Sequence, residues 1–438
     1  MIPLLVYRVL LSVVLLAPAA VAAAIGVVVR ESRERPDFLD ADSPPGLRVV
    51  QITTNQSSPS HHVYTEAHVF TPDSKRFVFF RGADLWLCDI ADNFSLRQLT
   101  DEPHVGGPSV TPDGKWLYYF AETASPLKAV LLKRVSLVTF QRETCLRIVD
   151  RVEGHDRLPY MLYDLSSISS DGKRLCIGAY FSDGVAANAP WGLLIFDLET
   201  PSARALKLGT EFFNPHPQYS RSRDPAHHRD ILVQHNQGGA TDPTGKWVKR
   251  RGPGGCVLHV VRDDGAHWRH VPVGLAIGEP LNGHEQWRGP FPTVIAATSF
   301  WPGMGGRLFE GVPIAVDQDK PHRGIATPRG RFTDLSRGIA EPRFWHFSID
   351  NSGMHVVSDW LELDAQGKKQ ISLVVGTLSD AANPEVKVTR LLHTRTSGDG
   401  QPAHPHPFFS PDAKMAFFNS DAEGKPQIWM VTGYTFPK

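Results

Sequence analysis

The sequence predicts an all-β protein, a seven-bladed β-propeller whose N-terminal strand closes the last blade. Two observations lead to this prediction: a strand–turn–strand unit recurs along the chain, and no segment shows sustained helical periodicity. The composition agrees, because the 438 residues include 37 glycines and 35 prolines, which supply many turns without making the sequence low in complexity.

The repeated unit is a short strand, a Ser/Thr-x-Asp turn and a second apolar strand. Asp followed by Gly or Asn has the chemistry of a tight hairpin turn. The clearest copies are residues 70–80, 110–120, 168–181, 347–360 and 409–421. Two further copies with altered turns are residues 216–236 and 283–301. Seven units of about 56 residues each are slightly longer than the usual propeller blade.

Residues 47–54, LRVVQITT, form an early strand that has no upstream partner. They are similar to LRQLTD, the outer strand of the first full unit. We expect them to complete the last blade, because closing the ring protects strand edges that would otherwise be exposed. The propeller domain is therefore predicted to span residues 47–438.

The N-terminal region is predicted to lie outside the propeller. Residues 1–30 contain an apolar run between Arg8 and Arg30, with an alanine-rich AAVAAA patch. The patch fits a signal-peptide cleavage site, whereas about 21 uncharged residues are long enough for an uncleaved membrane anchor. We expect an exported protein, periplasmic or extracellular, with a retained anchor as the alternative. Residues 31–46, which are charged and contain proline, are expected to form a linker.

Charge and motif content exclude several functions. The 46 basic and 46 acidic residues cancel, so the chain lacks the overall field of a nucleic-acid-binding protein. It has no Gly-x-Ser-x-Gly motif and no second domain for a serine triad, which excludes a peptidase propeller with its hydrolase attached. The cysteines, which form no Cys-x-x-Cys motif, leave disulfides and free thiols equally open. They are Cys88, Cys145, Cys176 and Cys256.

Histidines are concentrated at one position of the repeat. The inner strands of a propeller line its central channel, and the loops leading into them surround one mouth. Six of the 19 histidines precede a blade turn: His68, His216, His284, His346, His404 and His406. One such histidine is more often a hydrogen-bonded core residue, but six at equivalent positions indicate a functional cluster. Imidazole nitrogens joined by the amide oxygen of Gln401 suit a borderline divalent ion such as manganese, zinc, iron or nickel rather than calcium.

The stretch QPAHPHPFFSPD (401–412) places two of these histidines two positions apart. His404 and His406 each precede a proline, which disfavours the α conformation. In an extended chain, residues two apart point to the same face. We therefore expect both imidazoles to project in one direction from a stiff backbone.

Three motifs resemble those of the oligogalacturonate lyases, a family of pectin-degrading seven-bladed propellers. They are GHEQW (283–287), WHFSIDNSGMHVVSD (345–359) and QPAHPHPFFSPD (401–412). The metal-binding Gln-x-x-His-x-His spacing of the family matches Gln401, His404 and His406, and a further ligand on the preceding blade matches His346. The resemblance implies a divalent metal site, with Mn²⁺ as the expected ion, and β-elimination of short α-1,4-linked uronides.

The resemblance also implies a catalytic base. The catalytic histidine of the family lies in a Gly-His-Glu-aromatic context, which here is His284. The C5 proton of a uronide is weakly acidic because it lies beside a carboxylate. A cation bound to that carboxylate neutralises the developing charge, and a neutral imidazole can accept the proton.

The chain departs from the family pattern in one region. Where the family has a His-Glu-Gly motif, this chain reads QHNQGG (234–239), with Asn236 in place of the glutamate. The following strand, GGCVLHVVRDD, lacks the arginine that holds the uronate in the family. We expect contacts with an acidic oligosaccharide from other residues: His216, His235, Arg288 and Arg343, with Arg251 as a further candidate.

Two other functions remain open from the sequence. The first is a non-catalytic binding propeller similar to the periplasmic TolB-like proteins, which share the Ser-Pro-Asp-Gly blade turn but need no histidine cluster. The second is a cell-envelope interaction protein anchored by residues 9–29. Bound metal in the purified protein would distinguish the lyase from the binding propeller, and an uncleaved N-terminus in membrane fractions would support the anchored protein.

Overall fold

The computed structural model describes residues 26–252, 255–300, 304–316, 330–363, 366–367, 369–379 and 384–438. Residues 1–25 of the predicted signal peptide or anchor (residues 1–30) lie outside the described residues. Within the described ranges, no helix has the length and apolar character needed to cross a membrane. In the part of the chain that the structure describes, helical structure is confined to short 3₁₀ turns at η1 (Pro36–Phe38), η2 (Gly274–Ile277) and η3 (Gln401–Ala403).

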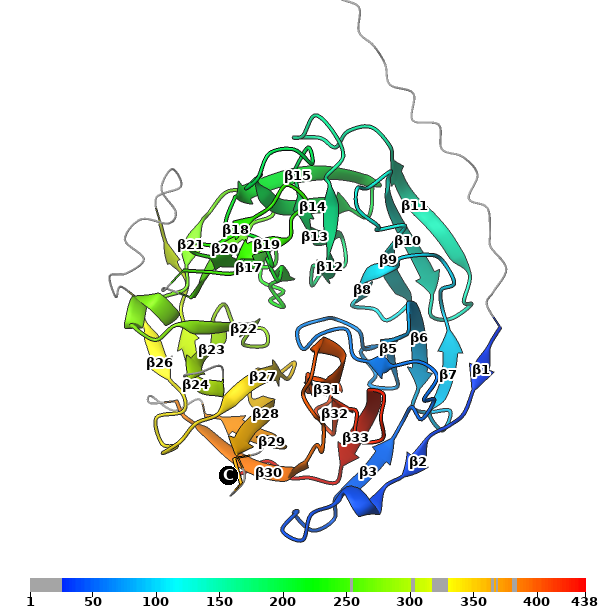
Figure 1. The fold of residues 1–438 in the computed structure, drawn as a ribbon, viewed down its shortest axis with the longest axis vertical. Coiled ribbons are helices and arrows are strands. Elements are labelled where there is room, and N and C mark those ends of the chain that lie inside the picture. The colour runs from blue at the N-terminus through cyan, green and yellow to red at the C-terminus, as the bar shows by residue number, and fades with distance from the viewer. Residues whose placement is uncertain are drawn as a thin grey trace, which may run out of the picture.

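The strands form seven blades around a central channel, which confirms the predicted propeller (Figure 1). Blade 1 contains β4 (Ser60–His61), β5 (Arg76–Arg81), β6 (Asp84–Asp89) and β7 (Ser95–Gln98), with β1 (Val28–Val29) at its edge. Blade 2 contains β8 (Gly106–Val110), β9 (Trp116–Ala121), β10 (Val130–Ser136) and β11 (Arg142–Ile148). Blade 3 contains β12 (Met161–Ile168), β13 (Arg174–Tyr180), β14 (Trp191–Asp197) and β15 (Ser202–Gly209).

Blades 4 to 6 are joined by bridging pairs into one continuous sheet. Blade 4 contains β16 (Gln218–Tyr219), β17 (Asp230–Asn236), β20 (Cys256–Arg262) and β21 (Arg269–His270), beside a small hairpin of β18 (Ala240–Thr241) and β19 (Trp247–Lys249). Blade 5 contains β22 (Leu281–Trp287), β23 (Val294–Phe300), β24 (Met304–Gly311) and β26 (Phe332–Asp334), and β25 (Ile314–Ala315) pairs with β21. Blade 6 contains β27 (Phe344–Ile349), β28 (His355–Leu363), β29 (Lys369–Leu378) and β30 (Val386–His393).

The predicted ring closure is present in blade 7. This blade contains β31 (Phe408–Phe409), β32 (Met415–Ser420), β33 (Gln427–Thr432), β3 (Arg48–Gln51) and β2 (Arg33–Glu34). Strand β3 pairs antiparallel with β33, so that Arg48 lies opposite Thr432. The first and last parts of the propeller are thereby held together by backbone hydrogen bonds.

The recurring turn is closed by its own side chains. The Thr71 hydroxyl donates to the Asp73 carboxylate at 2.7 Å, and the Ser410 hydroxyl donates to Asp412 at 2.7 Å. In each turn the same aspartate also accepts the backbone N–H two residues further on. These local bonds satisfy the backbone at the turn, which explains why the pattern recurs.

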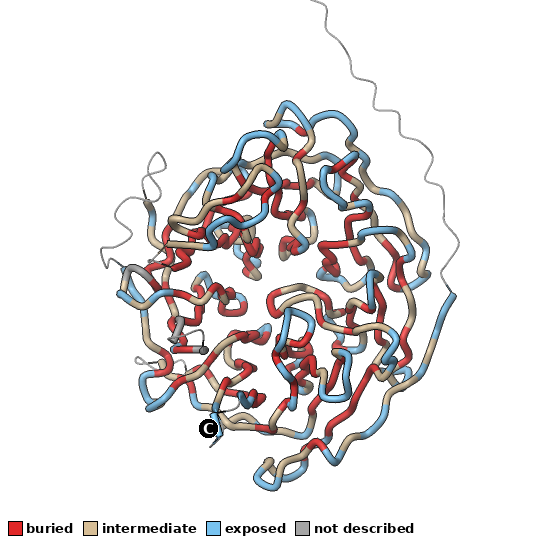
Figure 2. The backbone as a smooth tube through the Cα atoms, in the orientation of Figure 1, coloured by how far each residue is buried: buried red, intermediate tan, exposed pale blue. Residues whose placement is uncertain are grey.

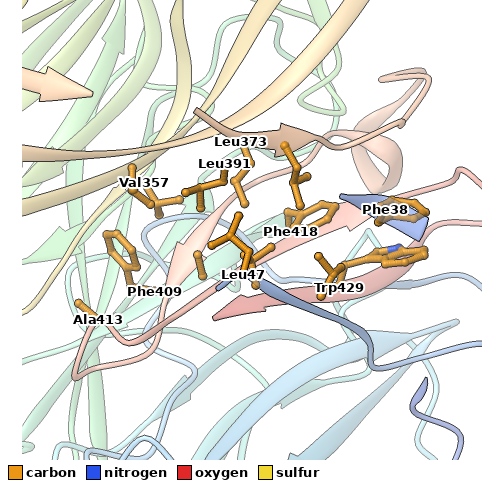
Figure 3. Packing of buried hydrophobic residues seen from close by; sticks show 14 residues of the cluster. Phe38, Leu47, Val357, Leu373, Leu391, Phe409, Ala413, Phe418 and Trp429 are labelled. Carbon is orange, nitrogen blue, oxygen red and sulfur yellow. The ribbon is translucent and has the colours of Figure 1, made fainter. Parts of the chain in front are cut away.

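Residues 31–46 do not form the expected linker. Strand β2 pairs with β3, and Phe38 is 2% exposed with its ring stacked on Trp429 at 3.9 Å between centroids (Figure 3). Arg33 and Arg35 both form salt bridges with Glu423. The prediction was wrong because one aromatic side chain and two charge pairs are enough to fix this polar segment on blade 7.

The hydrophobic core is divided among the interfaces between neighbouring blades. Buried residues follow the inner and middle strands of each blade, while exposed residues follow the outer loops (Figure 2). The cluster between blades 6 and 7 joins Val357 and Leu373 to Phe418 and Trp429 (Figure 3). All four cysteines are free thiols in this structure.

Candidate active site

Three of the predicted metal ligands meet at one end of the channel. His346 comes from β27, and His404 and His406 come from the loop between η3 and β31. Each offers one ring nitrogen, and these nitrogens lie within 4.8 Å of one another. Among the described residues, His404 Nδ1 and His406 Nε2 have no hydrogen-bond partner. Buried, unpaired nitrogens facing each other are the donor set that a divalent metal of the manganese-to-zinc series requires.

Asp359 of β28 fixes the orientation of His346. Its carboxylate lies 2.7 Å from His346 Nδ1 and accepts the backbone N–H of the same residue at 2.6 Å. Both side chains are buried, at 1% and 0% exposure. Burial raises the pKa of Asp359 to about 8. In its ionised form, which a bound cation favours, the carboxylate accepts the hydrogen bond from Nδ1–H and leaves the lone pair of Nε2 free to bind a metal.

The backbone around His406 differs from the expected strand. His404 is extended, with φ −63° and ψ 137°, but His406 has φ +40°. Left-handed conformations of residues with a Cβ are rare and strained, and they occur at functional sites. His216, which also precedes a proline, has φ +42°. The imidazole of His406 is therefore directed into the cluster by a local turn. It is not placed there by the alternation of side chains along an extended strand, as the sequence had predicted.

Gln401, the fourth predicted ligand, is the first residue of η3 and is exposed. It stands three residues before His404, as the motif requires. Gln401 is thus close to His404 in the sequence, but the structure shows no contact between its side chain and the three histidines. Its role as a ligand stays a prediction.

His284, the predicted catalytic base, lies next to the cluster. It belongs to β22 of blade 5, and its ring is 4.2 Å from that of His346 between centroids. Its Nδ1 has no hydrogen-bond partner in the described part of the chain. Burial, followed by the neighbouring imidazoles, lowers the pKa of His284, His346 and His406 well below the ordinary value. All three are therefore neutral near pH 7, and each carries a free lone pair.

A second group of polar residues adjoins the histidines. His216 Nδ1 lies 2.7 Å from Glu66 Oε1, and its Nε2 lies 3.1 Å from the hydroxyl of Tyr163, which in turn bonds Asn214. Burial lowers the pKa of His216, but the Glu66 carboxylate outweighs it and raises this pKa above the ordinary value. His216 can thus place a positive charge beside the neutral cluster.

The loop between β4 and β5 enters the channel and connects the two groups (Figure 1). The ring of Tyr64 lies 5.0 Å from His216, 4.8 Å from His406 and 6.4 Å from His346. The backbone carbonyl of Thr65 accepts a hydrogen bond from Gln286 of blade 5 at 3.1 Å. The loop therefore crosses the channel and forms a floor beneath the histidine cluster.

Glu285, which follows His284, is a buried carboxyl group without a hydrogen-bond partner among the described residues. Burial raises its pKa to about 7, and the nearby Glu66 adds to this effect while His216 and Arg251 oppose it. A carboxyl group with such a pKa exchanges protons near neutral pH.

The other predicted substrate contacts lie at different places. His235 packs against Phe212 and bonds Glu211 at 2.9 Å, inside blade 4. Arg288 forms a buried salt bridge with Glu310 at 2.8 Å.

Two other arginines lie near the histidine strands. Arg343, which bonds Glu341 at 2.8 Å, is partly exposed and stands three residues before His346. Arg251 lies against the backbone of β22, where its Nη1 donates to the carbonyl oxygen of Asn282 at 3.4 Å. Asn282 stands two residues before His284.

One histidine of the repeat pattern faces the other way. His68 lines a cavity at the opposite end of the channel, together with Arg221. Its place in the cluster is taken by Tyr64 and Glu66 of the same loop. The histidine pattern does not include Tyr64, Glu66 and Tyr163. Tyr163 nevertheless stands five residues before Ile168, as His404 stands five before Phe409.

Comparison with known proteins identifies the family. No protein-family model matches the chain. It is 52% identical over 412 residues to the oligogalacturonide lyase of Pectobacterium atrosepticum, covering 89% of this chain and 94% of that protein. The chain belongs to the oligogalacturonate lyase family. Another member, from Dickeya dadantii, is 23% identical over 414 residues, with the same coverage.

Solved structures of the family share the fold. An oligogalacturonate lyase in complex with manganese superposes with a TM-score of 0.67 at 19% identity, covering 94% of this chain and 99% of that one. The oligogalacturonate lyase of Vibrio parahaemolyticus gives a TM-score of 0.67 at 20% identity, covering 93% and 98%. Both matches cover more than nine-tenths of this chain.

Proposed function

We propose that this protein is a metal-dependent polysaccharide lyase that cleaves short uronide oligosaccharides of the oligogalacturonate type by β-elimination, with manganese as its ion. The observation that supports this proposal is the convergence of His346, His404 and His406 beside His284 in a member of the lyase family. A non-catalytic binding propeller does not account for three neighbouring imidazoles whose ring nitrogens lie within 4.8 Å of one another.

The donor set fits such an ion, because the imidazoles are neutral and Asp359 holds one of them in the required tautomer. A divalent cation bound there supplies a Lewis acid for the substrate carboxylate. His284 is placed to accept the C5 proton through its unpaired Nδ1. The electrons of the C5–H bond form the C4–C5 double bond, and the C4–O bond breaks with its pair on the departing oxygen.

The residues around the cluster position the substrate. His216, paired with Glu66 and Tyr163, provides a hydrogen-bond network on one side, and the Glu66 carboxylate raises the pKa of His216 and so favours its charged form. Tyr64 and the floor formed by its loop limit how deeply a sugar ring can enter. Arg251, on the backbone of the strand that carries His284, is the arginine best placed for a second carboxylate.

The test is a lyase assay on the purified protein. With digalacturonate and Mn²⁺, we expect rising ultraviolet absorbance from the unsaturated product. The His404→Ala/His406→Ala double variant should lose bound metal and activity together, whereas His104→Ala/His267→Ala, which changes two exposed histidines, should keep both. An active wild-type protein with no bound metal, or no activity on any of a panel of uronides, would contradict the proposal.

We also propose that the protein is exported to the periplasm or the cell exterior. The support is the apolar run between Arg8 and Arg30 with its alanine-rich patch. N-terminal sequencing of protein from soluble and membrane fractions tests this. A mature chain beginning within or just after the alanine-rich patch is expected, and an intact first residue in membrane fractions would indicate a retained anchor instead.

A further inference from the structure

A cavity lies at the end of the channel opposite the histidine cluster. Its volume is about 510 Å³, within the range of small-molecule sites. It is lined by the ends of the inner strands, including Ile168, Ile349 and Phe409, whereas the cluster is built from residues that precede or begin those strands. Thr65 of the β4–β5 loop lines it from the floor side. The loop thus separates two distinct sites.

Arg221 is the notable cation of this cavity. It is partly buried, and one of its Nη atoms donates to the backbone carbonyl of Ile349 at 3.0 Å. Burial lowers the pKa of Arg221 to about 10, and the more distant charges of Asp350 and Glu66 partly oppose this effect. Arg221 therefore remains charged at neutral pH. Within the described ranges Arg221 forms no salt bridge.

Other arginines with buried side chains are paired with carboxylates. Examples are Arg81 with Glu31, Arg142 with Asp101 and Arg288 with Glu310. A cation removed from water without a counter-ion is costly, so an unpaired arginine lining a cavity indicates a ligand that completes the pair. The carboxylate of Asp350, which also lines the cavity, already accepts hydrogen bonds from Ser352, Met354 and His355.

The rest of the lining favours an organic anion. Burial, and then the charge of Arg221, lowers the pKa of His68 to about 3, so its neutral imidazole adds hydrogen-bonding capacity without a second charge. Arg223 is exposed and adds a positive charge at the rim. About half of the lining residues are apolar, among them Phe70, Phe408 and several prolines.

We propose that this cavity is a binding site for a small organic carboxylate, of the size of one or two sugar rings, which pairs with Arg221. The planar guanidinium matches the two oxygens of a carboxylate, and it also matches phosphate. The apolar walls distinguish the two sources of oxyanion, because they favour a ligand with a carbon skeleton over a fully hydrated inorganic ion. The site is separate from the histidine cluster and does not depend on lyase activity.

Calorimetric titration with galacturonate, galactose and inorganic phosphate tests the proposal. The His404→Ala/His406→Ala variant serves as the background, because it lacks the metal cluster. There we expect saturable binding of galacturonate, no binding of galactose, and a loss of about tenfold or more in affinity on Arg221→Gln, as expected for a lost charge-assisted pair. Arg221→Lys, which keeps the charge but not the planar fork, should recover part of the affinity.

Three results would overturn the proposal. They are no binding of galacturonate in this background, binding unaffected by Arg221→Gln, and binding of phosphate but not of galacturonate. If Arg221→Gln does not fold, Arg221→Lys and the exposed Arg223→Gln replace it. Both should weaken binding about twofold or more, and unchanged affinity in both would overturn the proposal. Loss of lyase activity in His404→Ala/His406→Ala with retained galacturonate binding separates this site from the catalytic one.

Discussion

Asp359→Asn tests the carboxylate–histidine pair that supports the cluster. Asp359 contributes two short hydrogen bonds to His346, one to Nδ1 and one to the backbone N–H. Asparagine can accept only one of them with its single carbonyl oxygen, and its NH₂ group then faces Nδ1 as a donor. The proton of the imidazole must move to Nε2, which removes one of the three ring nitrogens from the metal site.

The expected effect is a loss of about 10- to 100-fold in Mn²⁺ affinity, the usual range for such a partner of a metal-binding histidine. This corresponds to about 1.4–2.7 kcal/mol. Competition with a fluorescent chelator measures it without reference to activity. Asp350→Asn is the matched control, because Asp350 accepts the same two kinds of hydrogen bond from His355 at the other end of the blade. Unchanged affinity in Asp359→Asn, or equal losses in both variants, would refute the reasoning.

Three further predictions concern stability. Glu66 raises the folded-state pKa of His216 against the effect of burial. The pair therefore stabilises the fold fully below the ordinary histidine pKa of 6.5, and this stabilisation is lost as pH rises through the raised value. Chemical denaturation across this pH range should show the decline in the wild-type protein and not in Glu66→Gln. Phe38→Ala should cost about 3–5 kcal/mol of unfolding free energy, whereas Val185→Ala, at a position 79% exposed, should cost little; equal values would show that η1 is not part of the core. Arg288→Met should cost about 3–5 kcal/mol of unfolding free energy because it leaves Glu310 buried and unpaired. The double variant Arg288→Met/Glu310→Gln should recover part of this loss in the same assay. A lower affinity for digalacturonate with unchanged stability would instead place Arg288 in the substrate site.

The sequence predicts the repeat and the cluster ligands well because both depend on local patterns. The blade turn closes through bonds within a few residues, as between Thr71 and Asp73, so it can be recognised in one dimension. His346 stands two residues before the serine of the turn that follows it, and His404 and His406 stand six and four residues before theirs. Once the blades are counted, the geometry of a closed ring brings these positions together.

The residues that were missed depend on packing between distant segments. Glu66 meets His216 only because its loop leaves the strand path and crosses the channel. The left-handed backbone of His406 follows from the surrounding loop, and the preference of a residue before proline does not reveal it. Phe38 is an isolated aromatic residue in a polar segment, and its burial depends on the position of Trp429 near the other end of the chain.

The pairing of β3 with β33 has a consequence for biogenesis. Arg48 finds its partner only at Thr432, so nearly the whole chain must be made before blade 7 can be completed. Contacts between such distant parts of a sequence form slowly. During synthesis the growing protein is an open arc with an exposed strand edge at each end, and such edges recruit other chains. A chain that stops a few residues short of Gln427–Thr432 therefore remains an open arc, with β3 free to pair with another molecule.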